Sequence, residues 1–162
     1  MIDLAAWGHA VGLLDLDPAD IGAIEPGPAH AAMIDRMSRY AWAFDERRIE
    51  LLADNFTADA SWTAEVRGEQ RIGPFDGREA IVGFMSGLWP QQTDQRRHMI
   101  LNHLVTALSE RTGTILSYHL LVSAADGVIT PLTTGFYRVA MRREPDGAWR
   151  IADFLAGYDI PF

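Results

Sequence analysis

The sequence contains no cysteine, and hallmarks of several other protein classes are missing as well. Without cysteine there can be no disulfide framework, thiol nucleophile or thiolate metal site. No apolar run approaches the roughly 18 residues of a membrane-spanning helix, and the first residues, Met1-Ile2-Asp3-Leu4, lack the basic start of a secretory signal. We therefore expect a cytoplasmic protein that does not bind membranes.

Positive charge is also scarce, because 14 Lys and Arg stand against 22 Asp and Glu and leave a formal net charge of −8. Nucleic acids are bound by clusters of Lys and Arg, which this chain does not have, so we expect no nucleic-acid partner. There is no glycine-rich phosphate loop and no closely spaced set of metal ligands. The sequence thus predicts neither a metal nor another cofactor.

The residues that are present predict one globular domain with an N-terminal arm. The chain has 162 residues, 48% of them apolar and 22% charged, which is ordinary for a folded domain. Turn-forming residues at 25–28 separate the arm, residues 1–26, from the main domain, residues 27–162. The arm's apolar residues recur at near-helical spacing and predict a short helix, which either covers core or closes over a site as a lid: Leu4, Trp7, Val11 and Leu14.

The spacing of apolar residues changes about half-way along the main domain. Helical spacing predicts three helices, over 28–48, around 49–53 and over 78–88, with a strand at 60–66 and a loop at 73–77. The second half alternates with period two and predicts four strands joined by hairpin turns: 96–109, 114–124, 129–142 and 149–158. We therefore expect an α+β fold in which a curved, mixed or antiparallel sheet wraps around the long first helix.

The first long strand is apolar on both faces. All the predicted helices pack on one face of the sheet, so the apolar residues of the other face must be buried by something else. Counting alternate residues places Leu101, His103 and Val105 on that second face. We expect it to pack against another copy of the chain, as a homodimer or homotrimer.

Asp45 is the first candidate for a functional group. It lies on the apolar stripe of the long helix with Met37 and Ala41, and a carboxylate that faces a core needs a partner. The alternative is an ordinary helix-end aspartate that pairs with Arg47 or Arg48 in solvent.

His98 is the second candidate, because it shares one face of its strand with Ile100 and other apolar residues. The alternative is a hydrogen-bonded core histidine. By alternation His103 faces the other side, and counting does not settle the face of His119. The three histidines lack the spacing of a metal site.

Tyr40 is the third candidate. It precedes Asp45 by five residues, so the two point about 140° apart on an ideal helix, and both reach one cavity only if the helix lines it broadly or is kinked. The alternative is a tyrosine at the margin of the core.

Together, the three candidates could perform acid–base chemistry. A carboxylate that orients a histidine makes a general base, and a tyrosine adds a neutral hydrogen-bond donor. Such a set suits proton abstraction next to a carbonyl, and hence elimination or isomerisation.

Four segments resemble the SnoaL-like branch of the nuclear-transport-factor-2-like superfamily: residues 37–45, 52–60, 77–81 and 97–102. The resemblance extends over about residues 28–162 and implies a cone-shaped α+β fold. The superfamily hosts dehydratases, isomerases, epoxide hydrolases, polyketide cyclases and non-catalytic subunits, so the fold alone does not select a reaction.

Within the superfamily, the pattern is most similar to scytalone dehydratase and bile-acid 7α-dehydratase. Asp45 and His98 fall where those enzymes carry the helix aspartate and the strand histidine that it orients, and Tyr40 matches the tyrosine of the bile-acid enzyme. Phe44 stands where scytalone dehydratase has its tyrosine, and that enzyme's second histidine falls on alanine here. Ketosteroid isomerase is also similar, but its general base would fall on Ala64.

The resemblance implies a cofactor-free lyase of the dehydratase type, or an isomerase, with a hydrophobic pocket for a bulky ring substrate such as a steroid, polyketide or terpenoid. In it His98 is the general base, Asp45 orients His98, and Tyr40 donates to the substrate oxygen. Four further residues are expected to contact substrate: Trp62, Phe84, Asn102 and His119. The alternative is a non-catalytic ligand-binding or assembly subunit, similar to the β subunits of ring-hydroxylating dioxygenases.

Overall fold

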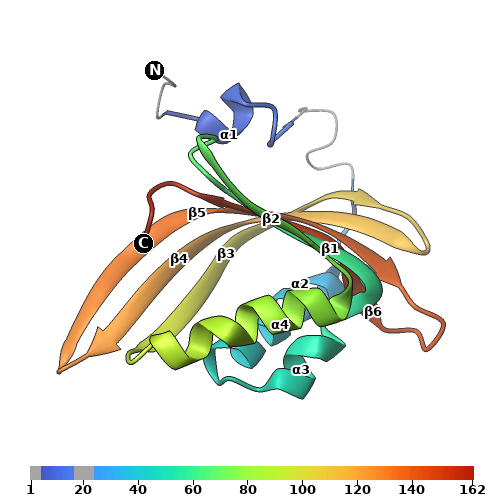
Figure 1. The fold of residues 1–162 in the computed structure, drawn as a ribbon. Coiled ribbons are helices and arrows are strands. Elements are labelled where there is room, and N and C mark those ends of the chain that lie inside the picture. The colour runs from blue at the N-terminus through green and yellow to red at the C-terminus, as the bar shows by residue number, and fades with distance from the viewer. Residues whose placement is uncertain (1–4, 17–23) are drawn as a thin grey trace.

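A computed structural model describes residues 5–16 and 24–162 (Figure 1). Its helices are α1 (Trp7–Ala10), α2 (Pro28–Asp45), α3 (Ile49–Asp54) and α4 (Arg78–Leu88), the last followed by a 3₁₀ turn, η1 (Trp89–Gln91). The strands are β1 (Phe56–Val66), β2 (Gln70–Asp76), β3 (Gln95–Leu108), β4 (Thr112–Ala125), β5 (Val128–Arg143) and β6 (Trp149–Tyr158). Among the described residues, no helix is long and apolar enough to cross a membrane. The predicted α+β class is confirmed.

The six strands form one mixed sheet in the order β2-β1-β6-β5-β4-β3. The predicted meander from β3 to β6 is present, and all its neighbours pair antiparallel. β6 then pairs in parallel with β1. The loop predicted at 73–77 is wrong, because β2 occupies most of it and pairs with β1. Glycine and proline are tolerated there since β2 is an edge strand with one unpaired side.

The long helix α2 packs along the concave face of the sheet, together with α3 and α4 (Figure 1). Its apolar stripe is spaced three to four residues apart, so one side of the helix is buried along its whole length. Met33, Met37, Tyr40 and Phe44 carry this stripe and join the main core. Tyr40 and Phe44 are thereby placed beneath the sheet, where both line a cavity.

The helix of the N-terminal arm, α1, lies on the opposite face of the sheet (Figure 1). Its Trp7 packs against Phe136 of β5, with ring centroids 5.2 Å apart, and against Leu155 of β6. The indole Nε1 also donates to Asp159 at 2.7 Å. The described part of the arm thus covers core on the convex face, on the far side of the sheet from α2. Leu4, part of the predicted stripe, lies outside the described residues.

A β-bulge in β3 changes which side chains face the helices. Leu101 pairs with Tyr118 and Leu104 with Leu116, so two residues of β3 between these pairs lie opposite one residue of β4. Asn102 is the extra residue and has a positive φ of 52°, a conformation that asparagine adopts more readily than most residues. The alternation is therefore reversed from Asn102 to Val105, and a second register shift follows between Val105 and Ala107.

This reversal corrects the face assigned to His103 and Val105. Val105 belongs to the main core beneath the sheet. His103 turns the same way and forms a hydrogen bond with Ser117 at 2.8 Å through its Nδ1. The convex face carries other side chains, and Met99, Leu101 and Tyr118 are exposed there. Of the three residues predicted for the second face, only Leu101 lies on it.

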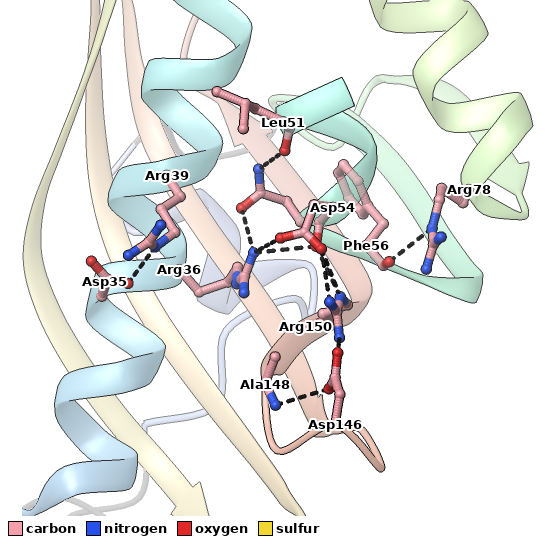
Figure 2. Close-up of polar contacts among 11 residues, drawn as sticks. Asp35, Arg36, Arg39, Leu51, Asp54, Phe56, Arg78, Asp146, Ala148 and Arg150 are labelled. Carbon is pink, nitrogen blue, oxygen red and sulfur yellow. Dashed lines mark hydrogen bonds and ion pairs between the residues drawn. The ribbon is translucent and has the colours of Figure 1, made fainter. Parts of the chain in front are cut away.

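A polar network joins α2, α3 and β6. Figure 2 shows Arg36 of α2 and Arg150 of β6 reaching the same carboxylate, that of Asp54, at 3.2 and 2.7 Å. Arg36 is buried and also lies 3.4 Å from Oδ1 of Asn55. Arg150 in turn pairs with Asp146 at 2.7 Å. Burial opposes it, but the hydrogen bonds from Arg150 and Arg36 hold the pKa of Asp54 below its usual value.

Candidate functional site

A cavity of about 510 Å³ lies between α2, α4 and the concave face of the sheet. Most of its wall is apolar, from Phe44 on α2, through Phe84, Met85 and Leu88 on α4, to Leu121 on β4. The apolar wall is interrupted by Tyr40 and His98, with glutamines and Arg96 further along it. A volume of this size falls within the range of small-molecule sites.

Asp45 and His98 form the predicted pair at this cavity. Oδ1 of Asp45 lies 2.6 Å from Nδ1 of His98, and Oδ2 accepts the backbone N–H of His98 at 2.8 Å. Both side chains are nearly buried, with exposed fractions of 5% and 8%. Since a carboxylate oxygen accepts, Nδ1 donates its hydrogen to Asp45, and in the neutral ring Nε2 holds the free lone pair. Nε2 makes no hydrogen bond within the described part of the chain, and His98 lines the cavity.

Contacts around the pair fasten the end of α2 to the start of β3. Arg97 pairs with Glu46 at 2.6 Å, and the side-chain amide of Gln95 donates to the backbone carbonyl of Asp45 at 3.3 Å. Arg47 donates to the carbonyl of Gln92 at 2.6 Å. Asp45 is thus held by His98 rather than by the neighbouring arginines that the alternative interpretation required.

Aromatic rings surround the imidazole. Phe44 meets the His98 ring edge-on at 5.0 Å between centroids, and Tyr40 lies 6.5 Å away in a similar orientation. Burial raises the pKa of Tyr40 well above its ordinary value, Tyr158 and Asp45 add to the rise, and the indole of Trp62 opposes it. Tyr40 therefore stays a neutral hydroxyl that can donate a hydrogen bond at any physiological pH.

The four predicted substrate contacts divide into two pairs. Trp62 on β1 and Phe84 on α4 line the cavity and pack together, with ring centroids 5.3 Å apart. Asn102 is exposed at the bulge and does not reach the cavity. His119 does not line it either, so the interpretation of these two residues as substrate contacts is not supported by their positions.

His119, on β4, is instead buried, with 2% of its surface exposed. It stacks on Tyr137 at 4.4 Å between centroids, and its Nε2 donates to the carbonyl of Gly157 at 3.1 Å. This packing needs glycine at position 135, because a Cβ there would meet the Gly157 carbonyl oxygen at 1.9 Å. Burial lowers the pKa of His119 to about 4, so the ring is neutral at physiological pH.

Residues near the C-terminal end of the described chain also form the wall, and the sequence patterns did not indicate them. Tyr158, at the end of β6, lines the cavity and lies against Phe162, with centroids 5.0 Å apart. Arg96 lies over the Phe162 ring and pairs with Asp94 at 3.3 Å. No recurring spacing in the sequence indicates these side chains, because they come from segments that are distant in the chain and meet only in the folded structure.

Within residues 5–16 and 24–162, no three His, Asp or Glu side chains gather into a group that could hold a metal ion.

Residues 28–154 match the SnoaL-like domain, which is most of the chain and includes α2, β3 and the Asp45–His98 pair. The chain belongs to the SnoaL-like family. No curated protein matches the chain in sequence. Many solved structures of this fold do match.

One similar structure, from Catenulispora acidiphila, is a complex with S-DNPA; it is 25% identical, with a TM-score of 0.70 over 81% of this chain and 93% of that one. A second, Aln2 from a Streptomyces species, is 20% identical with a TM-score of 0.70 over 84% and 95%. A third, from Novosphingobium aromaticivorans, is described as the β subunit of a putative aromatic-ring-hydroxylating dioxygenase. It is 16% identical, with a TM-score of 0.72 over 83% and 91%. The last two show that this SnoaL-like chain shares their fold.

Proposed function

We propose that this SnoaL-like protein is a cofactor-free lyase or isomerase that removes a proton next to a carbonyl group on a bulky hydrophobic ring substrate. The observation that carries the proposal is the Asp45–His98 contact of 2.6 Å, made by a histidine that lines a cavity. A buried aspartate bonded to Nδ1 leaves Nε2 basic and fixes its direction.

In the proposed reaction, Nε2 of His98 takes a proton from the carbon beside the carbonyl, and the electron pair of the broken C–H bond moves toward the carbonyl oxygen. Asp45 stabilises the imidazolium that forms, and the Tyr40 hydroxyl donates to the oxygen as it gains charge. The imidazolium then returns its proton. In an elimination the electron pair returns to form a carbon–carbon double bond, the C–O bond of a β-hydroxyl breaks, and the proton delivered to that oxygen releases water. In an isomerisation the electrons move through a conjugated double bond, and the proton is delivered to the carbon at its far end.

The cavity supports a ring substrate by its size and its lining. Phe44, Trp62 and Phe84 present flat apolar surfaces that a steroid-, polyketide- or terpenoid-like ring can cover. The similar Catenulispora acidiphila structure is a complex with S-DNPA, which supports a bound ligand for this chain as well.

The alternative is a non-catalytic subunit like a dioxygenase β subunit, whose fold this chain shares. Such a role places no demand on a buried carboxylate bonded to a cavity histidine. An Asp45 held by surface arginines would have favoured it, but Asp45 bonds to His98. The geometry therefore favours the enzyme.

The test measures the step common to elimination and isomerisation. A melting screen with steroid, polyketide and cyclic terpenoid ketones would select ligands, and their α-protons would then be followed by NMR in D₂O for exchange catalysed by the protein. We expect exchange with the native chain and a loss of about 10²–10⁴-fold in His98→Ala.

The matched control is His103→Ala, which removes a half-buried histidine of the same strand that bonds to Ser117. It should keep the exchange rate of the native protein. Ligands that bind without any proton exchange would refute the lyase or isomerase and support the subunit. Exchange that survives in His98→Ala would show that His98 is not the base.

A further inference from the structure

The indole N–H of Trp62 is a buried donor without an acceptor in hydrogen-bond geometry, although its ring lines the cavity. The indole nitrogen is buried, and the residue as a whole is 5% exposed. A buried N–H left unpaired costs free energy, and such a group in a folded protein calls for an explanation.

The residues packed around Trp62 limit which group could accept a hydrogen bond from its indole N–H. Phe75, Phe84 and Phe154 pack against the indole at centroid distances of 6.1, 5.3 and 6.4 Å, and none of them offers an acceptor. Tyr40 shares the contact with Phe154, at 4.9 Å, and lines the same cavity. The Trp62 indole also opposes the rise in the pKa of the Tyr40 hydroxyl that burial causes.

We propose that Trp62 is a positioning residue for Tyr40: its indole N–H donates to the Tyr40 oxygen and thereby directs the Tyr40 O–H into the cavity beside His98. This inference rests on the proposed function for its catalytic consequence, but the Trp62–Tyr40 bond itself does not depend on that function.

The chemistry follows from what a tyrosine hydroxyl can do. Its oxygen accepts through lone pairs and donates one hydrogen. Once a lone pair is held by Trp62, the hydrogen points away from the indole, toward the space in which a substrate oxygen would lie next to His98. A donor to the hydroxyl oxygen also strengthens the bond that the hydroxyl makes to a partly negative oxygen, because successive hydrogen bonds polarise one another. The substrate class implied is a ring ketone or ester whose carbonyl oxygen gains charge in the reaction.

The first experiment needs no substrate. In ¹⁵N-labelled protein the five tryptophans give five indole signals, which Trp→Phe variants assign one by one. We expect Tyr40→Phe to move the Trp62 indole proton upfield, as loss of an acceptor requires, and to leave the Trp89 signal in place. Trp89 is the matched reference, since its indole nitrogen is also buried and unpartnered but its ring does not line the cavity. An unmoved Trp62 signal overturns the proposal, whatever the protein catalyses.

The second experiment is a double-mutant cycle on the α-proton exchange of a ligand found in the screen. Trp62→Phe keeps an aromatic ring and removes the N–H, so we expect it to slow exchange about two- to tenfold, the value of one net hydrogen bond, with little change in ligand affinity. In the Tyr40→Phe background the same substitution should have no further effect. Trp89→Phe should have none in either background.

The two experiments separate the two proposals. A Trp62 signal that responds to Tyr40→Phe in a protein without exchange activity leaves the Trp62–Tyr40 bond standing and refutes the proposed function. Exchange activity with additive effects of Trp62→Phe and Tyr40→Phe refutes the positioning role and leaves the base intact.

Discussion

Asp45 and His98 lie 53 residues apart in the chain and meet through two hydrogen bonds, one to the imidazole Nδ1 and one to the histidine's own backbone N–H. The second bond ties the carboxylate to the strand as well as to the ring. The imidazole therefore has little freedom to turn, and its Nε2 keeps one direction in the cavity. An oriented base of this kind does not have to be rearranged for each turnover.

Asp45→Asn should lower α-proton exchange by about 10²-fold or more while leaving ligand affinity nearly unchanged. The amide can donate to Nδ1, which favours the tautomer with its proton on Nε2, and that tautomer is not a base. Exchange kinetics with a ligand from the screen, together with its dissociation constant, would check this. Glu46→Gln is the control, because it breaks the neighbouring exposed pair with Arg97. An Asp45→Asn protein with native exchange rates would show that the carboxylate has no catalytic role.

His119 should make stability depend on pH in the acidic range. Its pKa is about 4 in the folded protein, because burial disfavours the charged ring, and about 6.5 when the chain is unfolded. Below pH 6.5 the unfolded state therefore binds the additional proton, and stability falls as the pH drops toward 4. We expect a loss of about 2 kcal/mol between pH 7 and pH 5 from this group.

Urea unfolding at a series of pH values would measure this loss. His119→Gln keeps a donor toward the Gly157 carbonyl and should flatten this part of the profile. The matched control is the same substitution at an exposed histidine, His9→Gln. Equal profiles for the His119→Gln and native proteins would contradict the assignment of a buried neutral imidazole.

Asp54→Asn should destabilise the fold, because it takes the carboxylate away from both Arg36 and Arg150 (Figure 2). Asp54 is half exposed, so we expect the value of a hydrogen bond to a charged group, about 1–3 kcal/mol, rather than that of a fully buried ion pair. Asp35 of the same figure pairs with Arg39 on the exposed side of α2. Asp35→Asn should change the free energy of unfolding by less than about 0.5 kcal/mol. Equal effects in denaturant unfolding would contradict a special role for the network.

The convex face should hold a second copy of the chain. Met99, Leu101 and Tyr118 are exposed together on β3 and β4, where α1 does not reach them. Light scattering at micromolar concentration should give a dimer or trimer, and Leu101→Glu should shift it toward the monomer by placing charge in an apolar contact. Trp42 is an exposed apolar residue of α2, and Trp42→Glu should leave the mass unchanged. A monomeric native protein would rule out this interface.

Several features of the molecule were determined locally and could be predicted from the sequence alone. The stripe on α2 and the alternation in β3 to β6 are set by side chains a few residues apart, so the helix and the meander follow from them. The same counting placed Asp45 and His98 on inward faces before their partner was known. A charged or polar side chain on such a face can be recognised in the sequence, because the apolar residues around it follow the period of the helix or strand.

Other features were decided only by the tertiary structure. The extra residue at Asn102 reverses the alternation of β3 as far as Val105, which sends His103 and Val105 to the helix side and leaves Asn102 away from the cavity. The parallel pairing of β1 with β6 joins segments from the two ends of the domain, and no local pattern records which distant strands will pair. For the same reason the cavity wall made by Arg96, Tyr158 and Phe162 could not be read from spacing. The local sequence pattern indicates which residues face inward. Which residues they then contact depends on the packing of segments that are far apart in the chain.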